Sequence, residues 1–247
     1  MTKKPSVLGH QPPVASSVDI SDSIIATDFP GTFIKVIDNV FTPAECAALI
    51  ARAEASAAWR TALIQTPRGE RVDEEVRNND RILLFDKELA GELTRRLLPH
   101  VQEVAEIGPG STWEHIVGLP GFVTKTWKLL GVNERLSFLR YGPGHYFRPH
   151  YDGQLQLPDG RRSWVTVQIY LNDDDLSGGA TRIFGKAGED GEFYDVEPKV
   201  GRVLIFEQKP FIHSGEEVVR GMKYTMRSDF LFESVRWPGL VKLFTKS

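Results

Sequence analysis

The chain has 247 residues, of which 41% are hydrophobic and 26% charged, and its formal net charge is -3. This composition is typical of a folded globular protein, and the small net charge gives no electrostatic reason to expect a nucleic-acid partner. The sequence contains no run of about 18 apolar residues, the length that a membrane-spanning helix needs, so we expect no membrane partner. The single cysteine, Cys46, rules out an internal disulfide, and without a recognisable secretory signal it favours a cytoplasmic location.

The N-terminal segment has the composition of a tail. Residues 1–25 are rich in proline, serine and small side chains, and they show no hydrophobic period. Such segments bury too little apolar surface to fold alone. We therefore predict a mobile tail over residues 1–28 and a single domain over residues 29–247, with its functional core at about residues 132–234.

Two helices are predicted in the first half of this domain. The first is marked by an N-cap, a proline at the first helical position and a capping-box glutamate, which are Thr42, Pro43 and Glu45. Cys46 lies on the apolar stripe of this helix, so its thiol is predicted to pack in the core. The second helix starts after an Asp86 cap and ends or kinks near Pro99.

Short β-rich segments dominate the chain from about residue 134. They cover residues 135–141, 146–152, 164–171, 181–184, 202–206 and 223–232, and one earlier strand is expected at residues 33–38. Turn sequences rich in Gly, Pro, Asn and Asp separate them. This pattern predicts a mostly β fold of the sandwich or jelly-roll type, with the two upstream helices packed on one sheet. Residues 107–130 allow no assignment.

Two histidines and one aspartate stand out as candidate metal ligands. His150 and Asp152 are two residues apart, so on an extended backbone their side chains point to the same face. His213, from a distant strand, would complete a set of two histidines and one carboxylate, which is typical of non-haem Fe(II) oxygenases. Each residue alone could instead be a surface, core or turn residue. His145 lies an odd number of residues from His150 and is predicted to face away.

A cationic strand follows the second histidine. Lys223, Thr225 and Arg227 share one face of the strand predicted at residues 223–232. Two cations on one face suit a small dicarboxylate. The alternative is a solvated edge strand, on which lysine and arginine are common.

In these segments the chain resembles the prolyl 4-hydroxylase-like branch of the Fe(II)/2-oxoglutarate-dependent dioxygenases. The likeness covers about residues 136–232, and it rests on the order and spacing of residues 139–152, 169–173, 178–184, 198–206 and 213–224. The resemblance implies a double-stranded β-helix (jelly-roll) core. It also implies that His150, Asp152 and His213 bind Fe(II), and that Lys223 binds the distal carboxylate of 2-oxoglutarate.

Three further residues receive roles from the resemblance. Tyr141 matches a tyrosine that lines the co-substrate pocket, and Thr181 matches a structural threonine of a Gly-Gly-x-Thr turn. Arg227 either assists Lys223 in binding 2-oxoglutarate or pairs with an acid. The cofactors that the resemblance implies are Fe(II), 2-oxoglutarate and O2, with ascorbate as a candidate reductant.

The implied reaction is the hydroxylation of an unactivated C–H bond, with succinate and CO2 as co-products; desaturation and ring formation are alternative outcomes. The substrate is expected to be a small carboxylic or amino acid, another small molecule or a peptidyl proline. Arg77 and Arg81 lie in a polar run that could hold a substrate carboxylate or form a solvated loop. Two other functions stay open: a cupin-like metalloenzyme that does not use 2-oxoglutarate, and a non-catalytic binding module.

Overall fold

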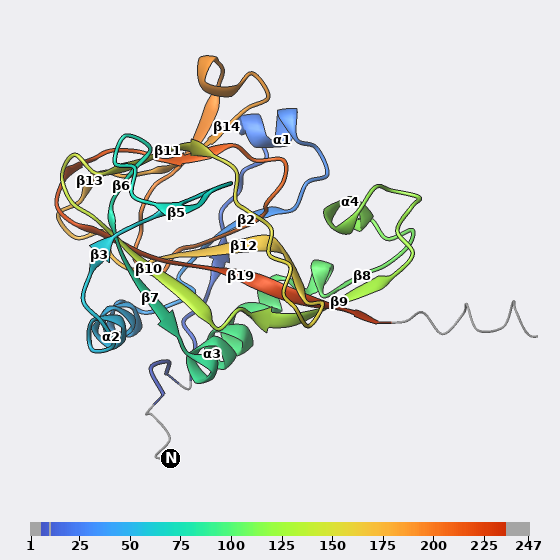
Figure 1. Ribbon diagram of the computed structural model, residues 1–247, viewed down its shortest axis with the longest axis horizontal. Coiled ribbons are helices and arrows are strands. Elements are labelled where there is room, and N and C mark those ends of the chain that lie inside the picture. Colours follow the sequence, from blue (N-terminus) through green and yellow to red (C-terminus); the bar gives the residue numbers. More distant parts are fainter. Residues whose placement is uncertain (1–5, 10, 236–247) are drawn as a thin grey trace, which may run out of the picture.

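The structure, a computed structural model, describes residues 6–9 and 11–235 and is built mainly from two antiparallel β-sheets (Figure 1). The larger sheet has ten strands. Its main path runs in the order β1 (Ser16–Ser17), β2 (Ile34–Asp38), β16 (Val203–Glu207), β12 (Arg162–Tyr170), β19 (Lys223–Val235), β10 (Arg135–Tyr141), β7 (Asp80–Phe85) and β3 (Arg60–Thr61). Off this path, β9 (Thr126–Val132) pairs with β19 and with β8 (Glu106–Ile107).

The smaller sheet has five strands and faces the larger sheet across a cavity that residues of both sheets line. Its order is β15 (Phe193–Val196), β14 (Thr181–Phe184), β17 (His213–Gly215), β11 (Tyr146–His150) and β6 (Arg77–Asn78). Two short two-stranded sheets complete the β structure: β4 (Ile64–Thr66) with β5 (Gly69–Arg71), and β13 (Ser177–Gly178) with β18 (Val218–Arg220). The predicted mostly β, jelly-roll architecture is confirmed.

The helices are few and short. They are α1 (Ile24–Asp28), α2 (Pro43–Glu54), α3 (Lys87–Leu97) and α4 (Glu114–Val117), and 3-10 turns lie at Leu98–His100, Gln102–Val104 and Gly188–Asp190. The predicted caps are confirmed, because Thr42 and Glu45 form a reciprocal capping box and Asp86 accepts a 3.0 Å hydrogen bond from the Leu89 N–H. The residues left unassigned at 107–130 form α4 and the edge pair β8–β9.

Helices α2 and α3 cover one face of the larger sheet (Figure 1). Every second residue of a strand points toward these helices. Phe138 of β10 and Met226 of β19 therefore lie in the same apolar cluster as Leu93 of α3. Cys46 is fully buried in this cluster, as predicted, and burial raises the pKa of its thiol to about 12. The intervening residues of β10, β12 and β19 therefore point the other way, toward the smaller sheet.

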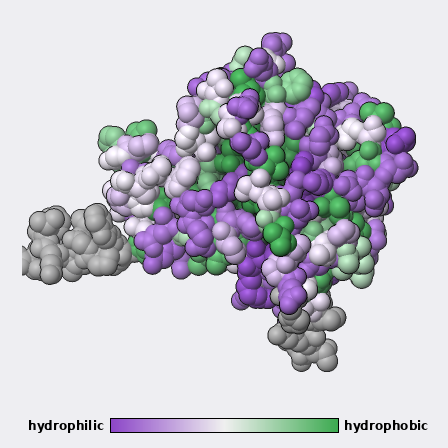
Figure 2. Space-filling view, turned by 180° about the vertical axis from the view of Figure 1, so that it is seen from behind, coloured by the Kyte–Doolittle hydropathy of each residue, from purple (hydrophilic) through white to green (hydrophobic). Residues whose placement is uncertain are grey.

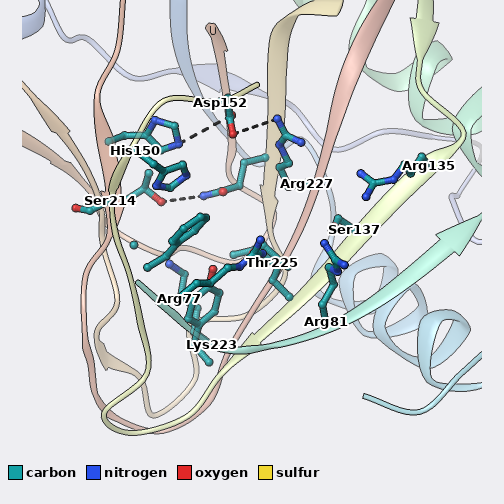
Figure 3. Close-up of a pocket in the computed structure, with 17 residues that line it drawn as sticks. Arg77, Arg81, Arg135, Ser137, His150, Asp152, Ser214, Lys223, Thr225 and Arg227 are labelled. Atoms are coloured by element: carbon teal, nitrogen blue, oxygen red, sulfur yellow. Dashed lines mark hydrogen bonds and ion pairs between the residues drawn. The ribbon is translucent and has the colours of Figure 1, made fainter. Parts of the chain in front are cut away.

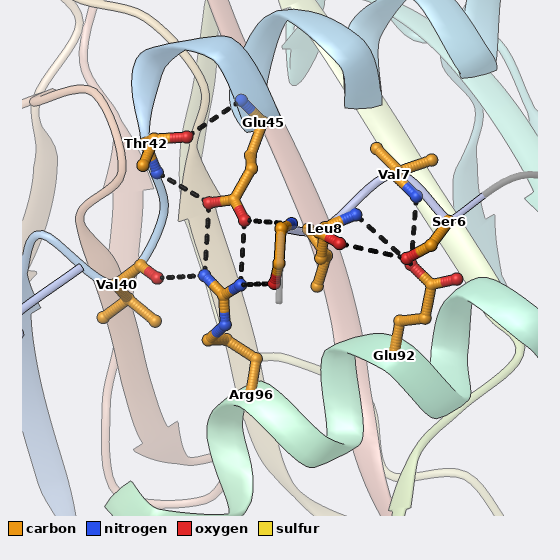
Figure 4. Close-up of polar contacts among 9 residues, drawn as sticks. Ser6, Val7, Leu8, Val40, Thr42, Glu45, Glu92 and Arg96 are labelled. Atoms are coloured by element: carbon orange, nitrogen blue, oxygen red, sulfur yellow. Dashed lines mark hydrogen bonds and ion pairs between the residues drawn. The ribbon is translucent and has the colours of Figure 1, made fainter. Parts of the chain in front are cut away.

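The segment before residue 28 makes defined contacts with the domain. Glu92 of α3 accepts hydrogen bonds from the Ser6 hydroxyl and the Val7 N–H, as Figure 4 shows. Glu45 accepts a 2.7 Å hydrogen bond from the Gly9 N–H. Further along, β1 pairs with β2, and Ile25 of α1 is buried. The tail boundary at residue 28 stays a prediction, but much of the segment lies against the domain.

The outer surface is mixed. Figure 2 shows one face of the molecule, on which apolar residues form separate patches among hydrophilic ones. Over the part of the chain that the structure describes, no helix has the length and apolarity needed to cross a bilayer.

Candidate metal centre

Two histidines meet where β11 and β17 of the smaller sheet pair. His150 and His213 are direct cross-strand partners, and their ring centroids are 4.4 Å apart. Each Nδ1 lies near the backbone carbonyl two residues earlier, at 2.8 Å from Arg148 for His150 and 3.3 Å from Phe211 for His213. A ring that donates its Nδ1–H to a carbonyl keeps its Nε2 lone pair free. The local backbone thus orients both rings so that Nε2 can bind a metal ion.

Asp152 lies just beyond the end of β11 and reaches the larger sheet. Its Oδ2 accepts a 2.6 Å hydrogen bond from the Thr166 hydroxyl of β12, and its Oδ1 lies 3.1 Å from a terminal nitrogen of Arg227 on β19. One donor atom from each of His150, Asp152 and His213 lies within 4.8 Å of the other two. The three predicted residues therefore converge from two strands and the segment that follows one of them.

The surroundings keep this carboxylate charged and one imidazole neutral. Burial by itself would raise the pKa of Asp152, but the positive charge of Arg227 and the two nearby histidines outweigh burial and hold this pKa well below its ordinary value. Burial and the neighbouring His213 lower the pKa of His150 to about 3. An ionised carboxylate and a neutral imidazole are the forms that bind a metal.

The donor set fits a ferrous ion. Two imidazole nitrogens and one carboxylate oxygen on one side of the ion leave coordination positions open for other ligands. Neighbouring groups orient the three protein ligands. The two backbone carbonyls hold the histidine rings, and Thr166 and Arg227 hold the carboxylate. His145 is not part of the cluster, and its predicted direction stays a prediction.

A cavity of about 100 Å³ lies between the two sheets beside this cluster. Figure 3 shows that its cationic side chains come from several strands of the larger sheet and from β6. The lining residues are mostly polar or charged: Arg77, Arg81, Arg135, Ser137, Leu139, Tyr141, Phe147, His150, Asp152, Gln168, Thr181, His213, Ser214, Gly215, Lys223, Thr225 and Arg227.

Lys223 is the first residue of β19 and lines one end of the cavity. It is 2% exposed, and its ammonium group lies 5.1 Å from the ring centre of Tyr141, its cross-strand partner on β10. Burial lowers the pKa of Lys223 to about 8. The described residues give this ammonium no hydrogen bond or ion pair, so it can accept an anionic ligand.

The turn before β14 brings backbone close to this lysine. Gly179 has a φ of +76°, and a Cβ there would lie 3.1 Å from the Lys223 side chain. Thr181, the first residue of β14, accepts hydrogen bonds from Gln168 and from the Tyr170 hydroxyl. These bonds support the structural role that the resemblance implies for Thr181.

Arg227 and Arg77 both line the cavity, but each is engaged with the protein. Arg227 lies 3.1 Å from Asp152 and 3.0 Å from Asp229. Arg77 donates to Asn79 at 2.8 Å, and its guanidinium lies 4.5 Å from the Phe147 ring centre. The Phe147 ring in turn stacks on His150, with centroids 3.6 Å apart. Arg81 also lines the cavity, and its side chain has no hydrogen bond or ion pair with the residues that the structure describes.

The candidate centre lies inside a segment with known relatives. Residues 136–228 match the family model of the 2OG-Fe(II) oxygenase superfamily. This match contains all three candidate ligands and Lys223. The segment is a 2OG-Fe(II) oxygenase domain.

The fold of the oxygenase agrees with solved prolyl hydroxylases. A prolyl-4-hydroxylase from Pseudomonas putida aligns with a TM-score of 0.55 at 18% identity, over 86% of this chain and 99% of that one. A prolyl hydroxylase from Trichoplax adhaerens, solved with a hypoxia inducible factor peptide fragment, aligns with a TM-score of 0.54 at 18% identity, over 84% and 86%. At this identity the likeness shows the fold. No curated protein matches the chain significantly.

The oxygenase domain makes the chain a 2-oxoglutarate-dependent iron dioxygenase and implies Fe(II), 2-oxoglutarate and O2. Sequence reasoning missed two residues of its cavity region. Thr166 supports Asp152, and Arg135 lines the cavity next to Ser137 on β10. Strand alternation could have pointed to Arg135, since it shares the parity of Tyr141 on the predicted strand at residues 135–141.

Proposed function

We propose that the oxygenase hydroxylates an unactivated C–H bond of a small-molecule or peptide substrate, with His150, Asp152 and His213 as the iron ligands. The observation that carries this proposal is the convergence of their donor atoms within 4.8 Å, beside a buried lysine that has no partner among the described residues. Iron bound together with 2-oxoglutarate supplies the oxidising chemistry: O2 is consumed, 2-oxoglutarate becomes succinate and CO2, and one oxygen atom enters the substrate.

The residues of the chain would position these groups. The carbonyls of Arg148 and Phe211 hold the two imidazoles with Nε2 toward the metal. Thr166 and Arg227 fix both oxygens of Asp152, which prevents the carboxylate from turning away. The contacts of Arg227 thus support the predicted alternative in which it pairs with an acid, and a direct role in 2-oxoglutarate binding stays a prediction.

Lys223 and Tyr141 would hold the co-substrate. A buried ammonium without a partner among the described residues is suited to the distal carboxylate of 2-oxoglutarate, because a charge-assisted bond there is shielded from water. Burial raises the pKa of Tyr141, while the Arg77 guanidinium acts against this shift. Tyr141 therefore stays a neutral hydroxyl that can donate a hydrogen bond to the same ligand.

The structure gives more support to Arg81 than to Arg77 as a residue that binds the substrate. The protein already uses the Nε and one terminal nitrogen of Arg77, through Asn79 and the Leu63 carbonyl. Its contacts with Phe147 and Tyr141 favour a positioning role. Arg81 remains available. Ascorbate as reductant and a cytoplasmic location stay predictions.

An anaerobic titration tests the proposed function. Adding 2-oxoglutarate to the Fe(II)-loaded protein should produce the visible charge-transfer band of a chelated keto-acid, and admission of O2 should yield succinate. Asp152→Ala should lose iron, seen as metal content at background, whereas Lys223→Met should keep iron and lose the band at moderate 2-oxoglutarate concentrations. Iron binding without the band and without succinate would instead favour a cupin-like enzyme that does not use 2-oxoglutarate. A protein that retains no iron would favour a binding module.

A further inference from the structure

Cationic side chains dominate the cavity beside the metal centre. Five of its lining residues are cationic, namely Arg77, Arg81, Arg135, Lys223 and Arg227, whereas Asp152 is the only acidic side chain in its lining as the structure describes it. A cavity of about 100 Å³ with this excess of positive charge calls for anionic occupants.

The protein matches two of the five cations, and the proposed co-substrate accounts for a third. Arg227 is paired with Asp152 and Asp229. Arg77 is bound by Asn79 and the Leu63 carbonyl. Lys223 would receive 2-oxoglutarate under the proposed function. What remains is the pair Arg81 and Arg135, for which the described residues provide neither a side-chain hydrogen bond nor an ion pair.

Arg81 and Arg135 approach the same part of the cavity from neighbouring strands. Arg81 of β7 lies directly opposite Leu139 of β10, and Arg135 lies two residues before Ser137 on β10, on the same face. Figure 3 shows both side chains at the end of the cavity where Ser137 lies. The charge of Arg81 is among the causes, after burial, that lower the pKa of Arg135, which agrees with two nearby guanidinium groups.

The metal and the co-substrate do not remove this excess. Fe(II) carries two positive charges and 2-oxoglutarate two negative ones, so together they leave the charge of the cavity unchanged. Arg81 and Arg135, both half-buried, then still lie near one another beside Ser137 (Figure 3), which costs free energy unless an anion lies between them. The end of the cavity at Arg135 is close to solvent, because its cross-strand partner Phe85 is 67% exposed.

Resting on the proposed function, we propose that the substrate is a carboxylic acid whose carboxylate binds between Arg81 and Arg135, above Ser137. Guanidinium groups bind carboxylates through paired N–H donors, which fixes the orientation of the ligand as well as its charge. The carboxylate would hold the substrate at the open end of the cavity, on the far side of Arg227 from His150 and Asp152 (Figure 3). Arg135 is thereby assigned a substrate-binding role that the sequence did not suggest.

A panel of free carboxylic acids and their matched primary amides tests this assignment. The acids span linear, cyclic and amino-acid frameworks, and each has an amide of the same shape without the charge. Binding is measured as the thermal shift of the protein loaded with Zn(II) and 2-oxoglutarate, which cannot turn over. Turnover is measured with Fe(II) as succinate formed above the substrate-free rate, together with product one oxygen heavier. Acids should be active in both assays and their amides should not.

Variants then test the two arginines. Arg81→Gln and Arg135→Gln should each raise the KM of an active acid by about 10- to 100-fold, the loss expected for one charged hydrogen-bond partner. The concentration of co-substrate needed for half-maximal activity should change far less. Arg95→Gln, an exposed residue of α3 on the opposite face of the sheet, is the matched control and should change neither quantity.

Three results would overturn the assignment: amides that bind as well as acids, an active acid that does not respond to either variant, or a panel in which no acid binds. A wild-type protein that forms no succinate even without substrate would reject the proposed function itself.

Discussion

We expect 2-oxoglutarate to bind more weakly in mildly alkaline solution, because Lys223 then loses its charge. Burial lowers the pKa of Lys223 from 10.5 to about 8, although the carboxylates of Glu197 and Glu216 act in the opposite direction. The rings of Tyr141 and Tyr170 lie beside the ammonium, and burial raises the pKa of both hydroxyls. These tyrosines stay uncharged where the lysine titrates.

The direction and magnitude of the effect follow from this pKa. A bound carboxylate favours the charged lysine, so binding raises the Lys223 pKa above its value in the free protein. The affinity is fully present below about pH 8 and is lost as the pH rises through that value toward the pKa of the complex. The charged fraction falls from about nine in ten near pH 7 to about one in ten near pH 9, so the dissociation constant of the co-substrate should rise about tenfold over this range.

The assay is calorimetric titration of 2-oxoglutarate into the Zn(II)-loaded protein across this pH range, with metal content measured at each pH. Lys223→Met should weaken binding at neutral pH by about 30-fold or more, since it truncates one partner of a buried charged pair, and it should abolish the pH dependence. Lys209→Met removes an exposed lysine and should preserve the wild-type profile.

A dissociation constant that stays the same between about pH 7 and about pH 9 in the wild type would refute this reasoning. So would a Lys223→Met protein with unchanged affinity, and that outcome would move the distal carboxylate to Arg227.

Three further predictions concern the support of the site and the fold. Thr166→Val removes the 2.6 Å hydrogen bond to Asp152 and should weaken iron binding by about 10- to 100-fold in chelator competition; unchanged affinity would contradict the supporting role. Glu45→Gln leaves the buried Arg96 without its charged partner and should lower the free energy of unfolding in urea by about 3–5 kcal/mol. Gly179→Ala should cost about 1–3 kcal/mol in the same assay, because φ there is +76° and the new Cβ would crowd the Val218 side chain; a wild-type midpoint would show that the turn adapts.

Local signals explain why parts of the fold could be predicted. The capping box of Thr42 and Glu45 and the Asp86 cap act within a single helical turn, so the residues that form them are neighbours in the sequence. The prediction that His150 and Asp152 point to the same face rests on the two-residue period of an extended chain, which also needs no distant partner. Residues 107–130 lacked such signals, since β8 pairs only with β9, and β9 is held by pairing with the distant strand β19.

The amino-acid sequence was enough to identify the side chains that carry the chemistry: two histidines, one carboxylate and a lysine whose order and spacing are shared with an oxygenase family. The roles of the remaining arginines, in contrast, became visible only in the folded chain. Arg77, Arg81, Arg135 and Arg227 look alike in the sequence, but the antiparallel register sets which of them meets an acid and which is left facing the cavity. That register joins strands far apart in the chain, because Leu139 of β10 lies opposite Arg81 on one side and Thr225 on the other, so no local pattern can specify it.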